Sequence, residues 1–152
     1  MESDLLLFNL KGKRLLPIVQ GGMGVGVSAH RLAGTVARRG GMGTIASIDL
    51  RHHHPDLVEQ SHRCRDKEKL DSLNLIALDR EVRAALAMAE GQGMVAVNVM
   101  KAVTEHAALI RQACESGVQA VVMGGGSAAG FARDDGKLPR CSTDPDPVRS
   151  TK

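Results

Sequence analysis

The sequence predicts an α/β protein with a parallel sheet, because short apolar runs alternate along the chain with segments of helical periodicity. Four runs have the length and flanks of buried strands, and glycine clusters follow the first and the last of them. Glycine is common where a parallel strand turns toward a helix or approaches a ligand. The four predicted strands are residues 15–20, 42–47, 94–99 and 120–123.

Helices are expected between these strands. Residues 29–39 place apolar side chains on one helical face, with Ser28 as the N-cap and Gly40 just past the end. Pro55 suits the first turn of a helix that reaches about residue 65. A charged stretch, 66–71, then precedes two further helices, near 75–90 and 104–116. The resulting order, β-α-β-α-α-β-α-β, implies helical crossovers between parallel strands.

Composition limits the classes of function. The chain has 152 residues, enough for one domain core, and 43% of them are apolar. Phe8 and Phe131 are the only aromatic residues, which disfavours a protein that stacks nucleic-acid bases. The formal charge of +3 comes from interspersed acidic and basic residues, so we expect no nucleic-acid partner.

The sequence also predicts a cytoplasmic protein without a membrane partner. The cysteines, Cys64, Cys114 and Cys141, are odd in number and form no C-x-x-C pair, which fits free thiols in a reducing compartment. The apolar residues near the N-terminus are too few for a signal segment, and no apolar run approaches membrane-spanning length.

The character of the sequence changes after Gly126. Residues 127–152 are rich in Pro, Asp, Arg and Ser, have no periodicity, and hold few large apolar side chains. Such a stretch buries too little surface to offset its ordering entropy. We therefore predict one folded unit, residues 1–126, and a disordered or aberrant tail, residues 127–152.

Two parallel architectures fit the residues alone. Gly24, Gly26 and Ala29 match the pattern G-x-G-x-x-A, and Asp49 follows about 20 residues later, as in a Rossmann dinucleotide site. However, the match begins four residues beyond the predicted strand end at Gln20, whereas a dinucleotide fingerprint begins almost at once. A (β/α)₈ barrel accommodates the same strands and helices. On the residues alone, the Rossmann fold and the barrel fit the sequence about equally well.

Several motifs, taken together and in order, resemble one family. The string LPIVQGGMGVGVSAHRLAGTVARRGGMGTIASIDL, followed by VAVNVM and QACESGVQAVVMGGG, resembles the N-terminal part of the nitronate monooxygenase (2-nitropropane dioxygenase) family. The resemblance covers about residues 16–126 and implies an FMN enzyme on a TIM barrel, related to flavin-dependent enoyl-acyl-carrier-protein reductases. A full barrel needs about 250 residues. The expected fold is thus an incomplete TIM (β/α)₈ barrel of about four parallel βα units.

The resemblance also implies a set of cofactor-binding residues. It places a backbone flavin contact after the first strand, a bond from Asn98 to the flavin ring, and a glycine turn after the fourth strand. On the residues alone, the glycines fit ordinary turns, and the Asn98 amide fits a bond to neighbouring backbone. The implied FMN-binding residues are Gln20, Gly21, Gly22, Met23, Asn98, Gly124, Gly125 and Gly126.

Members of that family oxidise alkyl nitronates with FMN and O₂ to carbonyl compounds and nitrite. A histidine of the second barrel half acts as base there, and none of the six histidines in this chain has that context. The phosphate-binding loops after strands seven and eight also have no counterpart. We therefore expect an inactive, truncated form with no catalytic residue assigned. A non-catalytic half-barrel that self-associates through its open sheet edges, and a Rossmann-type module, remain alternatives.

The histidine run His52, His53 and His54 invites a metal interpretation, with His62 nearby. Three consecutive side chains cannot all point at one ion, and no cysteine or acid completes a ligand spacing. We expect an exposed loop before a helix instead. His30 and His106 are expected to be surface or packing residues of helices.

Overall fold

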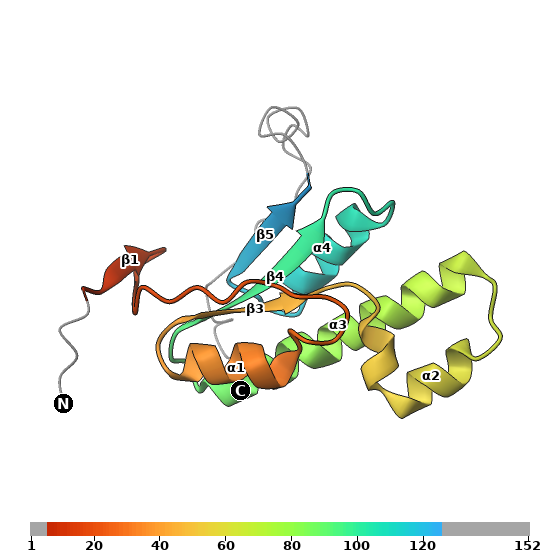
Figure 1. Ribbon diagram of the computed structural model, residues 1–152, viewed down its shortest axis with the longest axis horizontal. Helices are drawn as coiled ribbons and strands as arrows, with labels where there is room; N and C mark the ends of the chain where they lie inside the picture. Colours follow the sequence, from red (N-terminus) through yellow and green to blue (C-terminus); the bar gives the residue numbers. More distant parts are fainter. Residues whose placement is uncertain (1–5, 126–152) are drawn as a thin grey trace, which may run out of the picture.

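The computed structural model describes residues 6–125 and has a mixed α/β fold (Figure 1). Its parallel sheet has the strand order β3-β4-β5, and an antiparallel hairpin of β1 and β2 precedes it. In chain order the elements are β1 (Phe8–Leu10), β2 (Lys13–Leu15), α1 (His30–Arg38), β3 (Met42–Ala46), the 3₁₀ helix η1 (Leu50–His53), α2 (Pro55–Ser61), α3 (Lys67–Ala89), β4 (Met94–Met100), α4 (His106–Glu115) and β5 (Ala120–Gly124).

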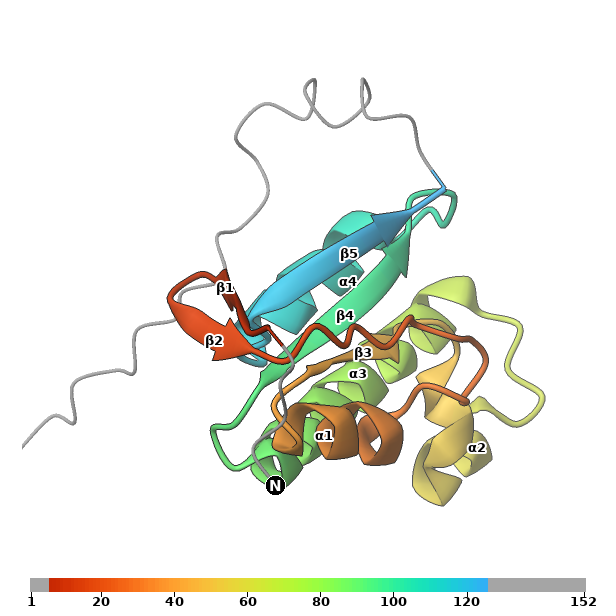
Figure 2. The same ribbon diagram turned by 60° about the vertical axis from the view of Figure 1, so that its left-hand side comes forward.

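The first predicted strand is confirmed only in part. Leu15 belongs to β2 of the hairpin, whereas residues 18–20 run parallel to β3. The Met42 N–H donates to the Ile18 carbonyl at 2.8 Å, and the Gln20 N–H donates to the Met42 carbonyl at 2.9 Å. Four chain segments therefore lie side by side in one direction, and Figure 2 shows the connection before α1 passing along β3. No closed barrel is seen in residues 6–125.

Helix α1 ends as predicted but begins differently. The Gly40 N–H donates to the Ala37 carbonyl and the Gly41 N–H to the Val36 carbonyl, which is the Schellman arrangement of a helix end. The prediction of Ser28 as N-cap is wrong, because Ala29 is the N-cap and no side chain caps it. Ser28 is instead buried in the loop before the helix.

Helix α3 is longer than predicted, and α2 is shorter. The Asp66 side chain caps α3 by accepting the N–H groups of Glu68 and Lys69, so the helix begins eight residues before the expected start. The charged stretch forms its exposed first turns, where Lys67 pairs with Asp71 one turn later. Helix α2 ends at Ser61 rather than near residue 65.

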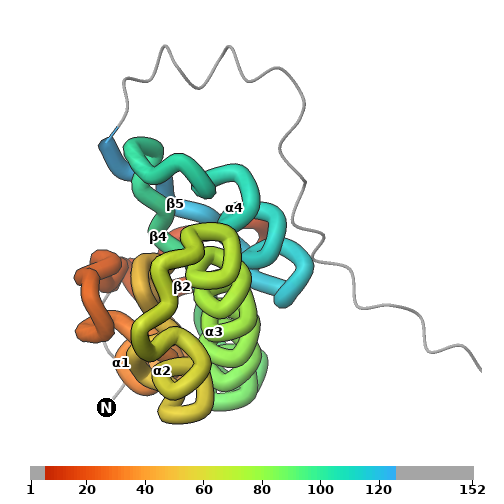
Figure 3. Tube along the Cα trace, turned by 90° about the vertical axis from the view of Figure 1, so that its right-hand side faces the viewer, coloured from red at the N-terminus to blue at the C-terminus, as the bar shows by residue number. Residues whose placement is uncertain are grey.

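The sheet is covered unequally on its two faces. Helices α1, α3 and α4 pack on one face against Ile45, Val95, Val97 and Val99. Figure 3 shows α3 and α4 on this side of the strands, and the connection before α1 on the other side. On the opposite face, the hairpin covers only the end where β4 and β5 begin (Figure 2). The carboxyl ends of the strands on that face have no covering helix among the described residues.

Asp79 connects α3 to the end of α4. Its Oδ1 atom accepts the Ser116 hydroxyl at 2.7 Å, and its carboxylate pairs with Arg83 at 2.9 Å. Burial tends to raise the pKa of Asp79, but the hydrogen bonds from Arg83 and Ser116 outweigh it, so the pKa lies below its ordinary value. An aspartate whose pKa is lower in the folded state stabilises that state at pH values above its pKa in the unfolded chain. This stability is lost as the pH falls through the pKa of the folded state.

We therefore expect Asp79→Asn to reduce the loss of stability between neutral pH and about pH 3, where an unfolded aspartate titrates. Urea unfolding midpoints measured along this pH range test it. Glu68→Gln, at an exposed carboxylate of the same helix, is the control and should retain the wild-type dependence. An Asp79→Asn variant with an unchanged pH dependence would contradict the assignment.

Some expectations are corrected or fall outside the described residues. Cys64 is free, but Cys114 is disulfide-bonded, so the expectation of free thiols is wrong at that residue. Cys141 and the predicted disordered tail, residues 127–152, lie outside the described residues. Within residues 6–125, no helix combines the length and the apolar character needed to cross a membrane.

Candidate functional site

The structure brings three of the sequence-predicted site residues, Gly22, Asn98 and Gly124, together at the carboxyl ends of the parallel strands. A Cβ atom on Gly22 would lie 2.5 Å from the Cβ of Asn98, so the loop after residue 20 packs directly on this side chain. A Cβ atom on Gly124 would lie 3.8 Å from the Asn98 Oδ1 atom. Gly125 follows with φ +78° and open space beside it, and Gly126 lies outside the described residues.

Asn98 occupies the middle of this arrangement on β4. Its register partners are Ala46 on β3 and Val122 on β5, so the three side chains share the face that the helices leave uncovered. The residue is half-buried, and its side-chain amide makes no hydrogen bond with any described residue. A partly buried amide is normally satisfied by protein, water or ligand. Asn98 therefore offers one donor group and one acceptor to a molecule at this edge.

Gln20 holds the glycine loop in place through its side chain. Its Oε1 atom accepts the Thr44 N–H at 2.9 Å, while its Nε2 atom donates to the Ser28 hydroxyl at 2.9 Å and to the Gly21 carbonyl. The Ser28 hydroxyl also accepts the Met23 N–H at 2.9 Å. The Gln20 side chain is thus engaged within the protein, and the Met23 side chain is half exposed. Sequence reasoning missed Ser28, which looked like a helix cap.

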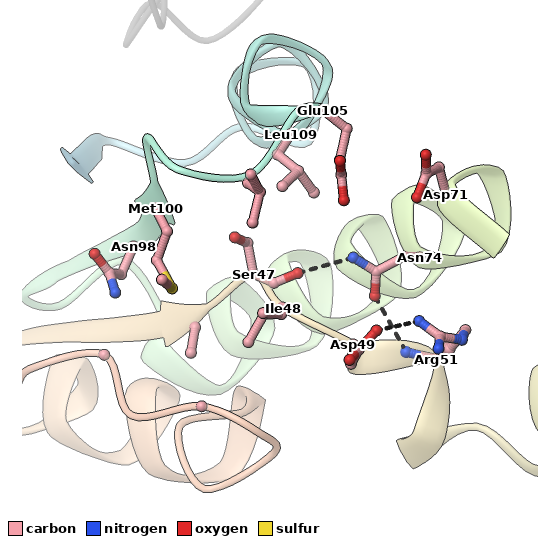
Figure 4. A pocket seen from close by; sticks show the side chains of 14 residues that line it. Ser47, Ile48, Asp49, Arg51, Asp71, Asn74, Asn98, Met100, Glu105 and Leu109 are labelled. Carbon is pink, nitrogen blue, oxygen red and sulfur yellow. Dashed lines mark hydrogen bonds and ion pairs between the residues drawn. The ribbon is translucent and has the colours of Figure 1, made fainter. Parts of the chain in front are cut away.

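A pocket of about 130 Å³ lies beside Asn98 (Figure 4). It is formed where β3 and β4 end, between the loop after β3 and the first turns of α3 and α4. Its apolar lining includes Ile48, Met100 and Leu109, and Gly22 and Gly24 form its edge. The volume suits a molecule of a few heavy atoms and is below the range of drug-sized sites.

The polar wall of the pocket was not predicted from sequence, apart from Asp49. Asn74 donates from Nδ2 to the Ser47 carbonyl at 2.9 Å, and its Oδ1 accepts the Arg51 N–H at 3.4 Å (Figure 4). Arg51 pairs with Asp49, while its Nε atom is buried without a hydrogen-bond partner among the described residues. Asp49 is therefore already paired, which does not favour its suggested role of binding a ribose.

Lys67 pairs with two further carboxylates at the rim of the pocket. Its Nζ atom lies 2.8 Å from Asp71 and 3.1 Å from Glu105, joining the first turns of α3 and α4. These hydrogen bonds raise the pKa of Lys67, so the ammonium stays charged through the neutral range. The acidic side chains of the pocket are consequently paired with bases, and the wall is polar without a strong net charge.

A buried carboxylate and two histidines form a separate cluster. Glu81 on α3 accepts the His30 N–H and contacts the His30 Nδ1, both at 2.7 Å. The His54 Nε2 lies 3.2 Å from Glu81 but without hydrogen-bond alignment. His54 is therefore not part of an exposed loop, and none of the three lines the pocket. Within residues 6–125, no group of three His, Cys, Asp or Glu side chains is arranged to hold a metal ion.

Together, these features define a mixed α/β protein with a small pocket and an unpartnered amide at the carboxyl ends of its parallel strands. The chain matches no protein-family model, no curated protein and no solved structure.

Proposed function

We propose that this chain is an incomplete (β/α)₈ barrel of nitronate monooxygenase type, which binds FMN at the carboxyl edge of its sheet. The observation that carries the proposal is the Asn98 amide, half-buried and without a partner among the described residues, between Gly22 and Gly124. In barrel enzymes the site lies at this end of the strands. The motif resemblance supports the same edge independently of the contacts.

The residues present fit a flat heterocycle. An amide both donates and accepts, as the mixed carbonyl and N–H edge of an isoalloxazine requires. Gly21 has open space where a Cβ would lie, and the backbone there can approach a ring closely. Gln20 and Ser28 fix the loop through the bonds described above, so the edge is organised before a ligand arrives.

The flavin supplies the two-electron oxidation of the substrate and the reaction with O₂. The chain would contribute orientation: Asn98 would hold the ring edge, and the pocket beside it would accept a small substrate such as an alkyl nitronate. Met100 and Leu109 provide an apolar wall for the alkyl group. The pocket lining contains no histidine that would act as a base. We therefore expect weak FMN binding and no turnover of this truncated form.

Titration of the full chain with FMN, followed by flavin fluorescence and by calorimetry, tests the proposal. Loss of one or two hydrogen bonds costs about 0.5–1.5 kcal/mol each, so Asn98→Ala should weaken binding about tenfold. Asn9→Ala is the matched control, because Asn9 is exposed on β1 of the hairpin, and it should bind like the wild type.

Equal FMN affinity of Asn98→Ala and the wild type would overturn the proposed site. Binding of NAD or NADP in preference to FMN would favour the dinucleotide alternative. Oxygen consumption with propyl nitronate would contradict the expected lack of turnover while supporting the flavin site.

A further inference from the structure

One face of the parallel sheet is left partly uncovered. Parallel sheets are almost always buried on both faces, because their crossovers place structure on each side. Here the hairpin covers the uncovered face only at the amino ends of the strands, through Leu15 and Phe8. Toward the carboxyl ends, Val122 on β5 is 39% exposed on the same face as Asn98. This part of the face lacks a covering layer among the described residues.

The two edges of the sheet are also open and lack the usual protection. Natural edge strands carry charges, prolines or bulges that prevent pairing with another chain. Residues 18–23 at one edge and 120–125 at the other contain no charged residue and no proline. Ile18 is 49% exposed and Val19 is 59% exposed. In the described part of the chain, β5 pairs only with β4, so its outer backbone groups are unpaired.

We propose that a second copy of this chain covers the open face and completes an eight-stranded barrel. A two-fold axis along the barrel places β5 of each copy beside residues 18–20 of the other. The inference rests on the incomplete-barrel part of the proposed function. Its partner-binding surface is the two uncharged edges and the open face between them.

The direction of the strands favours a second copy as the occupant. Residues 18–20, β3, β4 and β5 all run parallel, so rotation about the barrel axis keeps every strand of the copy in the same direction. Four segments from each copy give the eight strands of a closed barrel. Each edge needs an apolar, uncharged neighbour, and the opposite edge of the same chain is one. Each copy also brings its own hairpin to fill half of the amino end.

Sedimentation of the full chain without FMN tests the inference over a wide range of concentrations. We expect a dimer for the wild type. Val122→Lys places a charge on the contact face, and the loss of one central interface residue should raise the dimer dissociation constant more than about tenfold. Val58→Lys on α2 is the control, because Val58 is a valine of similar exposure (37%) outside this face, and it should remain dimeric.

Circular dichroism of each variant shows whether it is folded. Should Val122→Lys unfold, Val19→Lys replaces it, since this more exposed side chain can carry a charge without disturbing the core. A monomeric wild type, or lysine variants that stay dimeric, would overturn the inference. A dimer that does not bind FMN would support the dimer inference and refute only the flavin site. A monomer that binds FMN would support the flavin site and refute the dimer inference.

Discussion

Alanine at position 43 is expected to destabilise the protein by more than about 3 kcal/mol, a large fraction of the roughly 5–15 kcal/mol that stabilises an ordinary domain. Gly43 lies on β3 at the contact with α1, and a Cβ atom there would lie 1.9 Å from the Ala33 carbonyl oxygen. The carbonyl belongs to the backbone, and the position of a Cβ atom is fixed by the backbone, so no rotation of a side chain relieves the overlap. The helix would have to move away from the sheet and expose the buried Ala33 and Ala37. Urea unfolding, followed by circular dichroism, measures the loss.

Gly21→Ala is the matched control for this prediction. The Cβ atom of an alanine at position 21 would meet nothing within 4 Å, and Gly21 has no left-handed φ. We expect a change within about 0.5 kcal/mol, as for most surface substitutions. If the two alanine variants unfold at the same urea concentration, the close approach of α1 to β3 is not what constrains position 43.

The parallel core of the fold was predictable because its signals are local. Strands β3, β4 and β5 are confirmed to within one residue at each end, since each is a short apolar run bounded by glycine or polar residues. Gly40 was also recognised as the residue just past a helix end, and it has positive φ there. In each case the residues that determine the element lie within it or beside it.

The N-terminal hairpin and the first turns of α3 were not predictable in this way. Leu15 looks like part of a buried strand, but its partner is Phe8 across a two-residue turn, and Phe8 lies in a segment with no clear alternation. The start of α3 depends on the Asp66 cap and on the Lys67 pairs, which make a polar stretch helical. Apolar periodicity alone cannot detect exposed turns of this kind.

In the candidate site, too, some features were predictable from the sequence and others were not. Asn98 and the glycines were named because the motif resemblance implies them as flavin contacts, and their predicted place at the carboxyl ends of parallel strands agrees with a common edge. The contacts that shape this edge link residues far apart in sequence: Gln20 to Thr44, Arg51 to Asn74, and Ser47 to Asn74. Neither asparagine nor arginine at such positions carries a local signal, so only the folded chain reveals the pocket wall.

The buried Glu81 leads to the second large effect. Its side chain is 2% exposed and accepts the first N–H of α1, so it acts as a helix cap supplied by α3. It also holds the His30 ring and lies against His54 at the start of α2. Alanine at this position would leave the His30 N–H and the His30 imidazole without their acceptor, and would remove the carboxylate that lies beside His54. We expect Glu81→Ala to cost about 2–4 kcal/mol of stability.

Urea unfolding of Glu81→Ala and Glu81→Gln separates the stability that comes from the charged helix cap from the stability that comes from packing. Glutamine keeps the size of the Glu81 side chain and one carbonyl acceptor, but not its charge. Glutamine should cost less than alanine, and Glu68→Ala, at an exposed site of the same helix, should cost little. Ser28 binds the Gly21 carbonyl and lies directly before Ala29, the N-cap of α1. Loosening this end of the helix therefore also releases the loop that carries Gly21 and Gly22. Under the flavin proposal, Glu81→Gln would then bind FMN more weakly while remaining folded. Equal stability of Glu81→Ala and the wild type would show that α1 does not depend on the carboxylate.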